Sequence, residues 1–71
     1  MEKLKIDFEI PKILEADIDS LVRAVNVEKI GIDCWQEEIR TDLKCCEGVL
    51  TPEQIDLLME YYYVREWMTF D

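Results

Sequence analysis

The chain contains no histidine and a single serine, Ser20, among its 71 residues. Its three threonines, at positions 41, 51 and 69, have no neighbouring base. A nucleophilic triad needs a hydroxyl or thiol beside a group that takes its proton, and histidine usually supplies that group. We therefore predict that the protein is not an enzyme.

Basic residues are also scarce. Eight lysines and arginines stand against 17 acidic residues, which gives a formal net charge of −9. Such a chain repels phosphate backbones and anionic lipid, and it attracts basic partners over a Debye length of about 8–10 Å. We expect a basic protein as partner, with no direct binding to nucleic acid or membranes.

Long apolar runs are absent as well. No stretch approaches the roughly 18–20 apolar residues that cross a bilayer, and residues 1–5 lack the apolar stretch of a secretory signal. The three cysteines, Cys34, Cys45 and Cys46, cannot all pair within one chain, which fits a reducing compartment. We expect free thiols in a cytoplasmic protein.

Metal and cofactor motifs are missing. Cys45 and Cys46 are adjacent, so on a helix their side chains diverge by about 100°, whereas structural zinc needs four ligands in paired spacing. The acidic run at residues 15–19 lacks the glycine and terminal glutamate of a calcium loop. We predict no metal and no cofactor.

Cys34 is the one residue whose position suggests thiol chemistry, because it lies just inside the start of a predicted helix. A thiol-dependent enzyme or redox sensor would need this cysteine to react rapidly with alkylating reagents at neutral pH. The ordinary role of a free cysteine, as a small apolar residue beside Trp35, is favoured.

The length allows one domain, spanning residues 1–71. A chain this short buries only about 60% of its unfolded surface, so its stability is marginal without a partner subunit. The content of 49% apolar residues, with two glycines and two prolines, is typical of a folded chain.

Residues 4–10 alternate between apolar and charged side chains, which predicts a half-buried β-strand that ends at Pro11. A single strand needs a partner from this chain, a second copy or a target. The internal candidate is a second short strand near residues 25–32, weakened by Gly31. That pairing would make the fold α+β.

Helical spacing follows the proline. A first helix should begin at Pro11 or be capped at Asp17, and should end near Asn26. Its apolar face comprises Leu14, Ile18, Leu21, Val22 and Val25. A second helix should start with Asp33 as N-cap and end before Gly48, with an apolar stripe of Ile32, Trp35, Ile39, Leu43 and Cys46.

The third helix carries the clearest local signal, Thr51-Pro52-Glu53-Gln54, in which Thr51 caps and Gln54 reaches back. Leu50 and Ile55 form the accompanying hydrophobic staple, and the helix should run to about Trp67. Its predicted core residues are Ile55, Leu58, Met59 and Tyr62. The short connection predicts a helical hairpin, so the expected fold is mainly α: a three-helix domain with an N-terminal strand.

Acidity is concentrated in the second half of the chain. Residues 1–32 hold seven acids and five bases, whereas residues 33–71 hold ten acids and three bases. On the third helix Glu53, Asp56 and Glu60 recur at intervals of three and four, and the row continues to Tyr63 and Trp67. A solvated face is the ordinary explanation of such a row.

The neighbouring aromatic residues favour a binding surface instead. Tyr61, Tyr62 and Tyr63 span about 200° of a helix, so at least one should stand on the surface. Tyrosine and tryptophan are common anchors at interfaces, and tyrosine among acids suits guanidinium groups. The predicted partner-binding residues are Glu53, Asp56, Glu60, Tyr63 and Trp67, extended by Glu37 and Glu38.

In size, acidity and tyrosine-bearing helices the chain is similar to small inhibitors of phages and mobile elements, such as anti-CRISPR proteins and other nucleic-acid mimics. The resemblance is one of type, and no motif carries residue roles across. It implies a protein-binding inhibitor or regulator whose acidic face engages a basic nucleic-acid-binding protein or nuclease. The alternative is an assembly module that forms homodimers through the N-terminal strand and the C-terminal aromatics, with acidity serving solubility.

Overall fold

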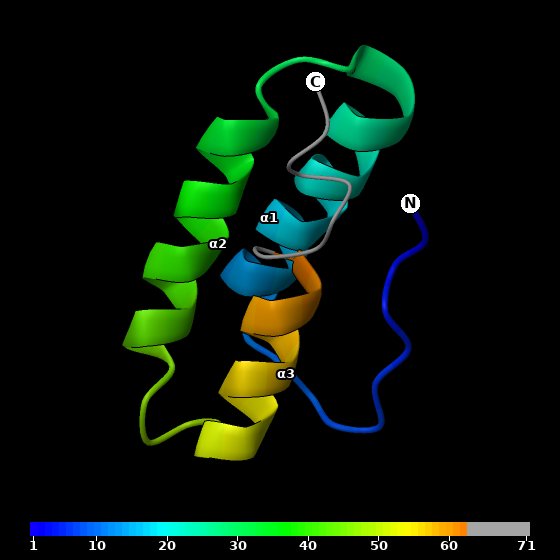
Figure 1. The fold of residues 1–71 in the computed structure, drawn as a ribbon. Coiled ribbons are helices and arrows are strands. Elements are labelled where there is room, and N and C mark those ends of the chain that lie inside the picture. The colour runs from blue at the N-terminus through cyan, green and yellow to red at the C-terminus, as the bar shows by residue number, and fades with distance from the viewer. Residues whose placement is uncertain (63–71) are drawn as a thin grey trace.

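Three helices account for most of the described part of the chain, residues 1–62 of this computed structural model. They are α1 (Lys12–Arg23), α2 (Ile32–Cys45) and α3 (Pro52–Tyr62), with a short π-helical turn, η1 (Ala24–Glu28), after α1. Successive helices run in opposite directions, and α2 and α3 form a hairpin (Figure 1). The predicted three-helix domain and its hairpin are confirmed.

Apolar side chains from all three helices meet in one core. Those with no more than 1% of their surface exposed are Leu14, Ile18 and Leu21 of α1, Ile39 and Leu43 of α2, and Leu58 and Tyr62 of α3. Their spacing of three or four residues places them on one side of each helix. The predicted apolar stripes therefore identify the core, with Ile32 and Trp35 packed half-buried against it.

The start of α3 follows the predicted capping box. The Gln54 backbone N–H donates to Thr51 Oγ1 over 3.2 Å, and the Thr51 backbone N–H donates to Gln54 Oε1 over 3.0 Å. Leu50 is buried and Ile55 packs half-buried against the same core. The reciprocal bonds satisfy two backbone donors that the first turn would otherwise leave unpaired.

The prediction of Asp33 as N-cap of the second helix is wrong. The helix begins one residue earlier, at Ile32, and Gly31 stands at the N-cap with φ 77°. Glycine adopts this left-handed conformation without a steric penalty, so the chain can turn sharply into α2. Asp33 then lies in the first turn, where its charge interacts favourably with the helix dipole.

The alternative of a strand near residues 25–32 is also wrong. After Arg23 the backbone continues as a π-helical turn, in which the Lys29 N–H bonds the Ala24 carbonyl. Arg23 and Glu28, also five residues apart, form an ion pair over 3.4 Å. Lys29 ends the turn with φ 57°, so helical structure extends past the predicted stop at Asn26.

The predicted N-terminal strand does not form a ladder within the described chain. Leu4, Ile6, Phe8 and Ile10 are half-buried while Lys5, Asp7 and Glu9 are exposed, as the alternation predicts. However, no other strand lies beside this segment in the described residues, and Asp7 and Phe8 form a bend. The apolar side chains pack on the helical core instead of within a sheet.

Two tyrosines hold this segment against the helices. The Leu4 backbone N–H donates to the Tyr62 hydroxyl over 2.8 Å, and the Tyr61 hydroxyl donates to the Glu2 carbonyl over 2.7 Å. The two rings meet edge to face, with centroids 4.8 Å apart. Asn26 Nδ2 also donates to the Met1 carbonyl over 2.7 Å. Side chains thus anchor the start of the segment, at Met1, Glu2 and Leu4, in place of the predicted partner strand.

Adjacent leucines of α3 offer a matched test of the core. Leu58 is 1% exposed and Leu57 is 46% exposed. We expect Leu58→Ala to lower the free energy of unfolding by about 2–5 kcal/mol, because it leaves a cavity in the core that the three helices share. Leu57→Ala should cost less than about 1 kcal/mol. Urea unfolding followed by circular dichroism would measure both, and equal losses would contradict the assigned core.

The bond between Tyr62 and Leu4 gives a second prediction. Tyr62→Phe keeps the buried ring but leaves the Leu4 N–H without its acceptor, at an expected cost of about 0.5–1.5 kcal/mol. Amide hydrogen exchange at Leu4 should become faster than in the wild-type chain. Tyr61→Phe is the control, because its hydroxyl bonds Glu2 instead of Leu4. Unchanged exchange at Leu4 in Tyr62→Phe would refute this anchoring role.

Candidate functional site

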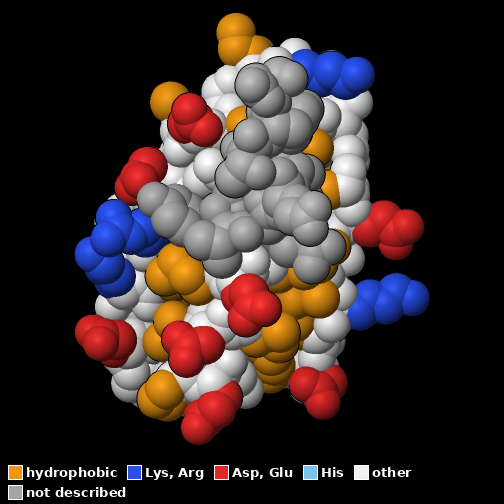
Figure 2. All heavy atoms as spheres, in the orientation of Figure 1, with side chains coloured by type: hydrophobic (Ala, Val, Ile, Leu, Met, Phe, Trp, Pro, Cys, Tyr) orange, Lys and Arg blue, Asp and Glu red, His pale blue; other side chains and the backbone are white. Residues whose placement is uncertain are grey.

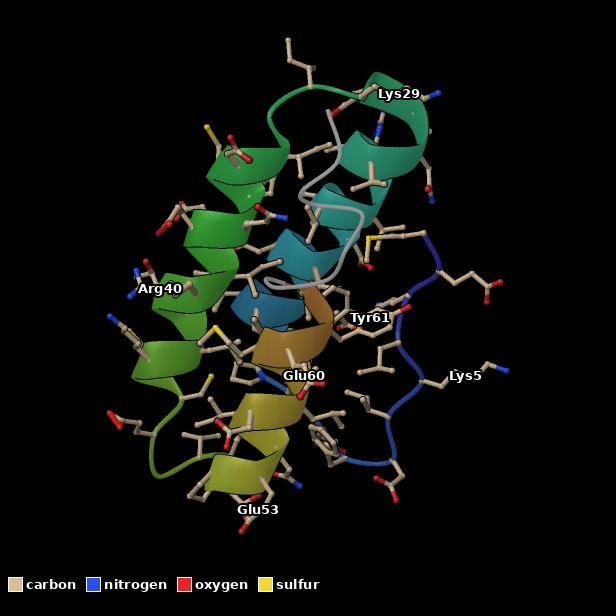
Figure 3. All side chains as sticks on the ribbon, in the orientation of Figure 1. Lys5, Lys29, Arg40, Glu53, Glu60 and Tyr61 are labelled. Carbon is tan, nitrogen blue, oxygen red and sulfur yellow. The ribbon has the colours of Figure 1, made fainter. Side chains whose placement is uncertain are left out.

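The acidic row predicted on the third helix is present on the surface of α3. Glu53, Asp56 and Glu60 are all exposed. They fall within about 60° around the helix axis and span roughly 10 Å along it, at 100° and 1.5 Å per residue. Figure 3 shows Glu53 and Glu60 projecting from the same side of α3.

None of these three carboxylates forms an ion pair with a described residue. The sequence of α3 contains no lysine or arginine that could neutralise them locally. The acids of α1 differ, because Lys3 lies 2.8 Å from Asp19 and 3.5 Å from Glu15. Within residues 1–62 the negative charge of α3 is therefore not neutralised, and Figure 2 shows acidic side chains gathered on the lower face.

The structure places the other predicted acids on α2. Glu37 Oε1 lies 3.6 Å from Arg40 Nη1, one turn away on the same helix. Glu38 lies near Asp42, at the contact between α1 and α2. Glu53, Asp56 and Glu60 thus form a row on one helix, while Glu37 pairs with Arg40 and Glu38 lies beside the like-charged Asp42. Tyr63 and Trp67, the predicted aromatic continuation, lie outside the described residues.

The two described tyrosines serve the fold. Tyr62 is 1% exposed, and burial raises the pKa of its phenol. Tyr61 is half-buried with its hydroxyl bonded to the Glu2 carbonyl. The expectation that one of the three tyrosines stands on the surface therefore rests on Tyr63 alone, which lies outside the described residues.

An apolar groove of about 330 Å³ borders the acidic row. Its floor combines the end of α2, the connecting turn and the start of α3, through Leu43, Leu50, Pro52, Ile55 and Met59. Lys44, Glu47 and Asp56 also line it, so Asp56 belongs both to the groove and to the row. A partner that covers the row could bury an apolar side chain in this groove.

A second groove, of about 480 Å³, lies beside the N-terminal segment. Ile6 and Phe8 contribute from the segment, and Ile18, Leu58 and Tyr62 contribute from the helices. Lys3, Glu9, Lys12 and Glu15 supply its charged side chains. The segment thus covers the core incompletely where it crosses α1 and α3.

A carboxyl cluster that the sequence analysis missed lies where α1 meets α2. Asp42 Oδ2 is buried and has no hydrogen-bond partner among the described residues. Desolvation, together with the neighbouring carboxyl group of Asp17 and the charge of Glu38, raises the pKa of Asp42 to about 7. Protonation of Asp42 avoids a desolvated negative charge beside these two acids. The i, i+4 spacing of Glu38 and Asp42 was visible in sequence, but the approach of Asp17 was not.

The cysteines and acids of the described chain give no metal centre. All three cysteines are free, with Cys34 and Cys45 exposed and Cys46 buried. Burial raises the pKa of the Cys46 thiol, which lowers its reactivity at neutral pH. Within residues 1–62 no three cysteine or acidic side chains are grouped so that they could hold a metal ion.

No helix within residues 1–62 is long and apolar enough to cross a membrane. No protein-family model, curated protein or solved structure matches the chain.

The Asp42 cluster predicts a dependence of stability on pH. Its pKa is about 7 in the folded chain against an ordinary value of 3.8, so the folded state retains a proton that the unfolded state releases between these values. The stabilisation is complete below about pH 4 and is lost as the pH rises toward 7. Asp42→Asn, which keeps a donor, should reduce this loss and raise stability above neutral pH.

Thermal unfolding of the wild type and of Asp42→Asn at about pH 5 and about pH 8 measures the effect. The free energy of unfolding changes with pH because the folded and unfolded states bind different numbers of protons. Asp33→Asn, an exposed site on the same helix, is the control for the removal of one charge. The same difference between the two pH values in wild type and Asp42→Asn would disprove the assignment.

Proposed function

We propose that the protein is a non-enzymatic inhibitor or regulator that acts in the cytoplasm. Its acidic α3 face binds a basic nucleic-acid-binding protein or nuclease. The observation that carries the proposal is the row of Glu53, Asp56 and Glu60, exposed on one side of α3 without an ion pair to any described residue. A surface of unpaired carboxylates suits a partner that normally binds phosphates, because both groups are anionic oxygen acceptors for arginine and lysine.

The cost of the row to the isolated chain supports the same interpretation. Like charges three and four residues apart on a helix destabilise it by a few tenths of a kcal/mol per pair. No lysine or arginine of α3 offsets this repulsion, and the helix dipole favours only Glu53, in the first turn. A basic partner would remove this repulsion on binding, so association should be fast and strongly dependent on salt.

The groove beside the row defines a second part of the proposed interface. Affinity at protein interfaces comes mainly from a few buried anchors, while charges set the rate and the orientation of approach. Ile55 and Met59 line the groove and are half-buried, so part of each side chain remains exposed for a partner to bury. The expected partner surface therefore combines arginine or lysine residues with an apolar side chain that enters this groove.

Charge reversal of the row tests the proposal. The wild-type chain and the variant Glu53→Lys/Asp56→Lys/Glu60→Lys would capture proteins from nuclease-treated host lysate at low and moderate salt. We expect the wild type to retain a basic nucleic-acid-binding protein at low salt and to lose it at moderate salt. The Kd of the variant for this partner should be at least about a hundredfold higher than that of the wild type. Circular dichroism should show an unchanged fold.

A matched control separates the face from the total charge. Glu2, Glu28 and Asp33 are exposed acids outside both α3 and the groove, and replacing them by lysine changes the net charge equally. This control should keep most of its affinity. Retained binding by the α3 variant would refute the proposal, and equal losses in both variants would show that total charge, not this face, recruits the partner.

A further inference from the structure

The backbone of residues 5–10 makes no hydrogen bond with any other described residue. The segment runs along the outside of the molecule in Figure 1. Unpaired N–H and C=O groups on extended backbone form a template for another strand. The side chains already alternate between core and solvent, so a partner strand would pair without turning the segment over.

Only one edge of the segment is open. In an extended strand successive residues direct their N–H and C=O groups to opposite edges. The even-numbered residues Glu2 and Leu4 bond the hydroxyls of Tyr61 and Tyr62, so their edge faces the helices. The opposite edge belongs to the odd-numbered residues from Lys5 to Glu9. Within residues 1–62 no group bonds to this edge, so it can accept a second strand.

The charges along the segment select the partner. Two lysines, Lys3 and Lys5, precede Ile6, and two acids, Asp7 and Glu9, follow it. An antiparallel copy of the same segment therefore meets it with opposite charges. We propose that two copies of the chain associate through this edge, as an antiparallel pair of N-terminal segments centred on Ile6.

In this register Lys5 lies opposite Asp7 of the second copy, and Lys3 lies opposite Glu9. The apolar positions also match, because Ile6 faces Ile6 and Leu4 faces Phe8 on the core side. Cross-strand pairs of opposite charge stabilise a sheet, and like charges directly opposite destabilise it. Centring the pair on Asp7 would oppose two aspartates, and centring it on Lys5 would oppose two lysines.

Pairing along the whole segment requires the bend at Asp7 and Phe8 to straighten. No hydrogen bond from residues 5–10 to the described chain holds this bend. Lys3 already has ion pairs to Asp19 and Glu15, so the inner pair of Lys5 and Asp7 carries the specificity. Both side chains are exposed and have no ion pair among the described residues, so changing them should leave the monomer folded.

Charge exchange at these two positions tests the register. Sedimentation equilibrium of the full chain, from micromolar to millimolar concentration, should show a wild-type dimer. Lys5→Asp places two aspartates opposite each other twice per dimer, and Asp7→Lys does the same with lysines. Each should raise the dimer Kd by roughly tenfold or more, since every pair acts twice by symmetry. The double variant Lys5→Asp/Asp7→Lys should restore wild-type association.

Mixing the two single variants is a stricter test of the register. A heterodimer of Lys5→Asp with Asp7→Lys has opposite charges at both inner pairs, so the mixture should dimerise more tightly than either variant alone. In the wild-type dimer, amide exchange should slow at Lys5, Asp7 and Glu9, whose N–H groups point to the partner, and not at Ile6.

A wild-type chain that stays monomeric at millimolar concentration would overturn the proposal and would leave the edge to a strand of another protein. A dimer that neither single variant weakens, or that the double variant does not restore, would overturn this register. The α3 charge-reversal variant should dimerise like the wild type, so the two proposals can fail independently.

Discussion

The burial of Tyr62 is the constraint on which much of the structure depends. Among residues 1–62 it is the largest fully buried side chain, and it completes the core that α1 and α2 begin. Its hydroxyl accepts the Leu4 N–H, so one residue both closes the helical core and holds the N-terminal segment. A buried hydroxyl needs a hydrogen-bond partner, and so does the N–H of an extended backbone segment. The bond from the Leu4 N–H to the Tyr62 hydroxyl meets both needs.

This arrangement separates the surface into parts with different roles. On the α1 side, Lys3 of the anchored segment neutralises Asp19 and Glu15. On α3 the residues between Glu53, Asp56 and Glu60 are all uncharged, and no cation of residues 1–62 pairs with these acids. The row therefore follows from where the basic residues of the described chain lie. This asymmetry, and not the net charge alone, is the basis for proposing a basic partner.

The two proposed interfaces use different physics on different parts of the molecule. The α3 face offers charge and an adjacent apolar groove, which suits a partner of another kind. The free edge of the N-terminal segment offers backbone groups and a charge pattern that is complementary to itself. A dimer joined at that edge would display two α3 faces, so association would increase the avidity for a basic target without any new contact to it.

The sequence by itself determined the three helices, most of the core and the capping box, because spacing and Thr51-Pro52-Glu53-Gln54 are local signals that tertiary packing did not override. It also located the acidic row, since helical spacing alone puts Glu53, Asp56 and Glu60 on one side. Only the tertiary structure decided that tyrosine hydroxyls anchor the N-terminal segment at Glu2 and Leu4 in place of a strand, and that Asp17 lies beside Asp42. Each of these contacts joins residues that are far apart in the chain. The periodicity of the sequence predicts which side of an element a residue faces, but not which distant residue it contacts there.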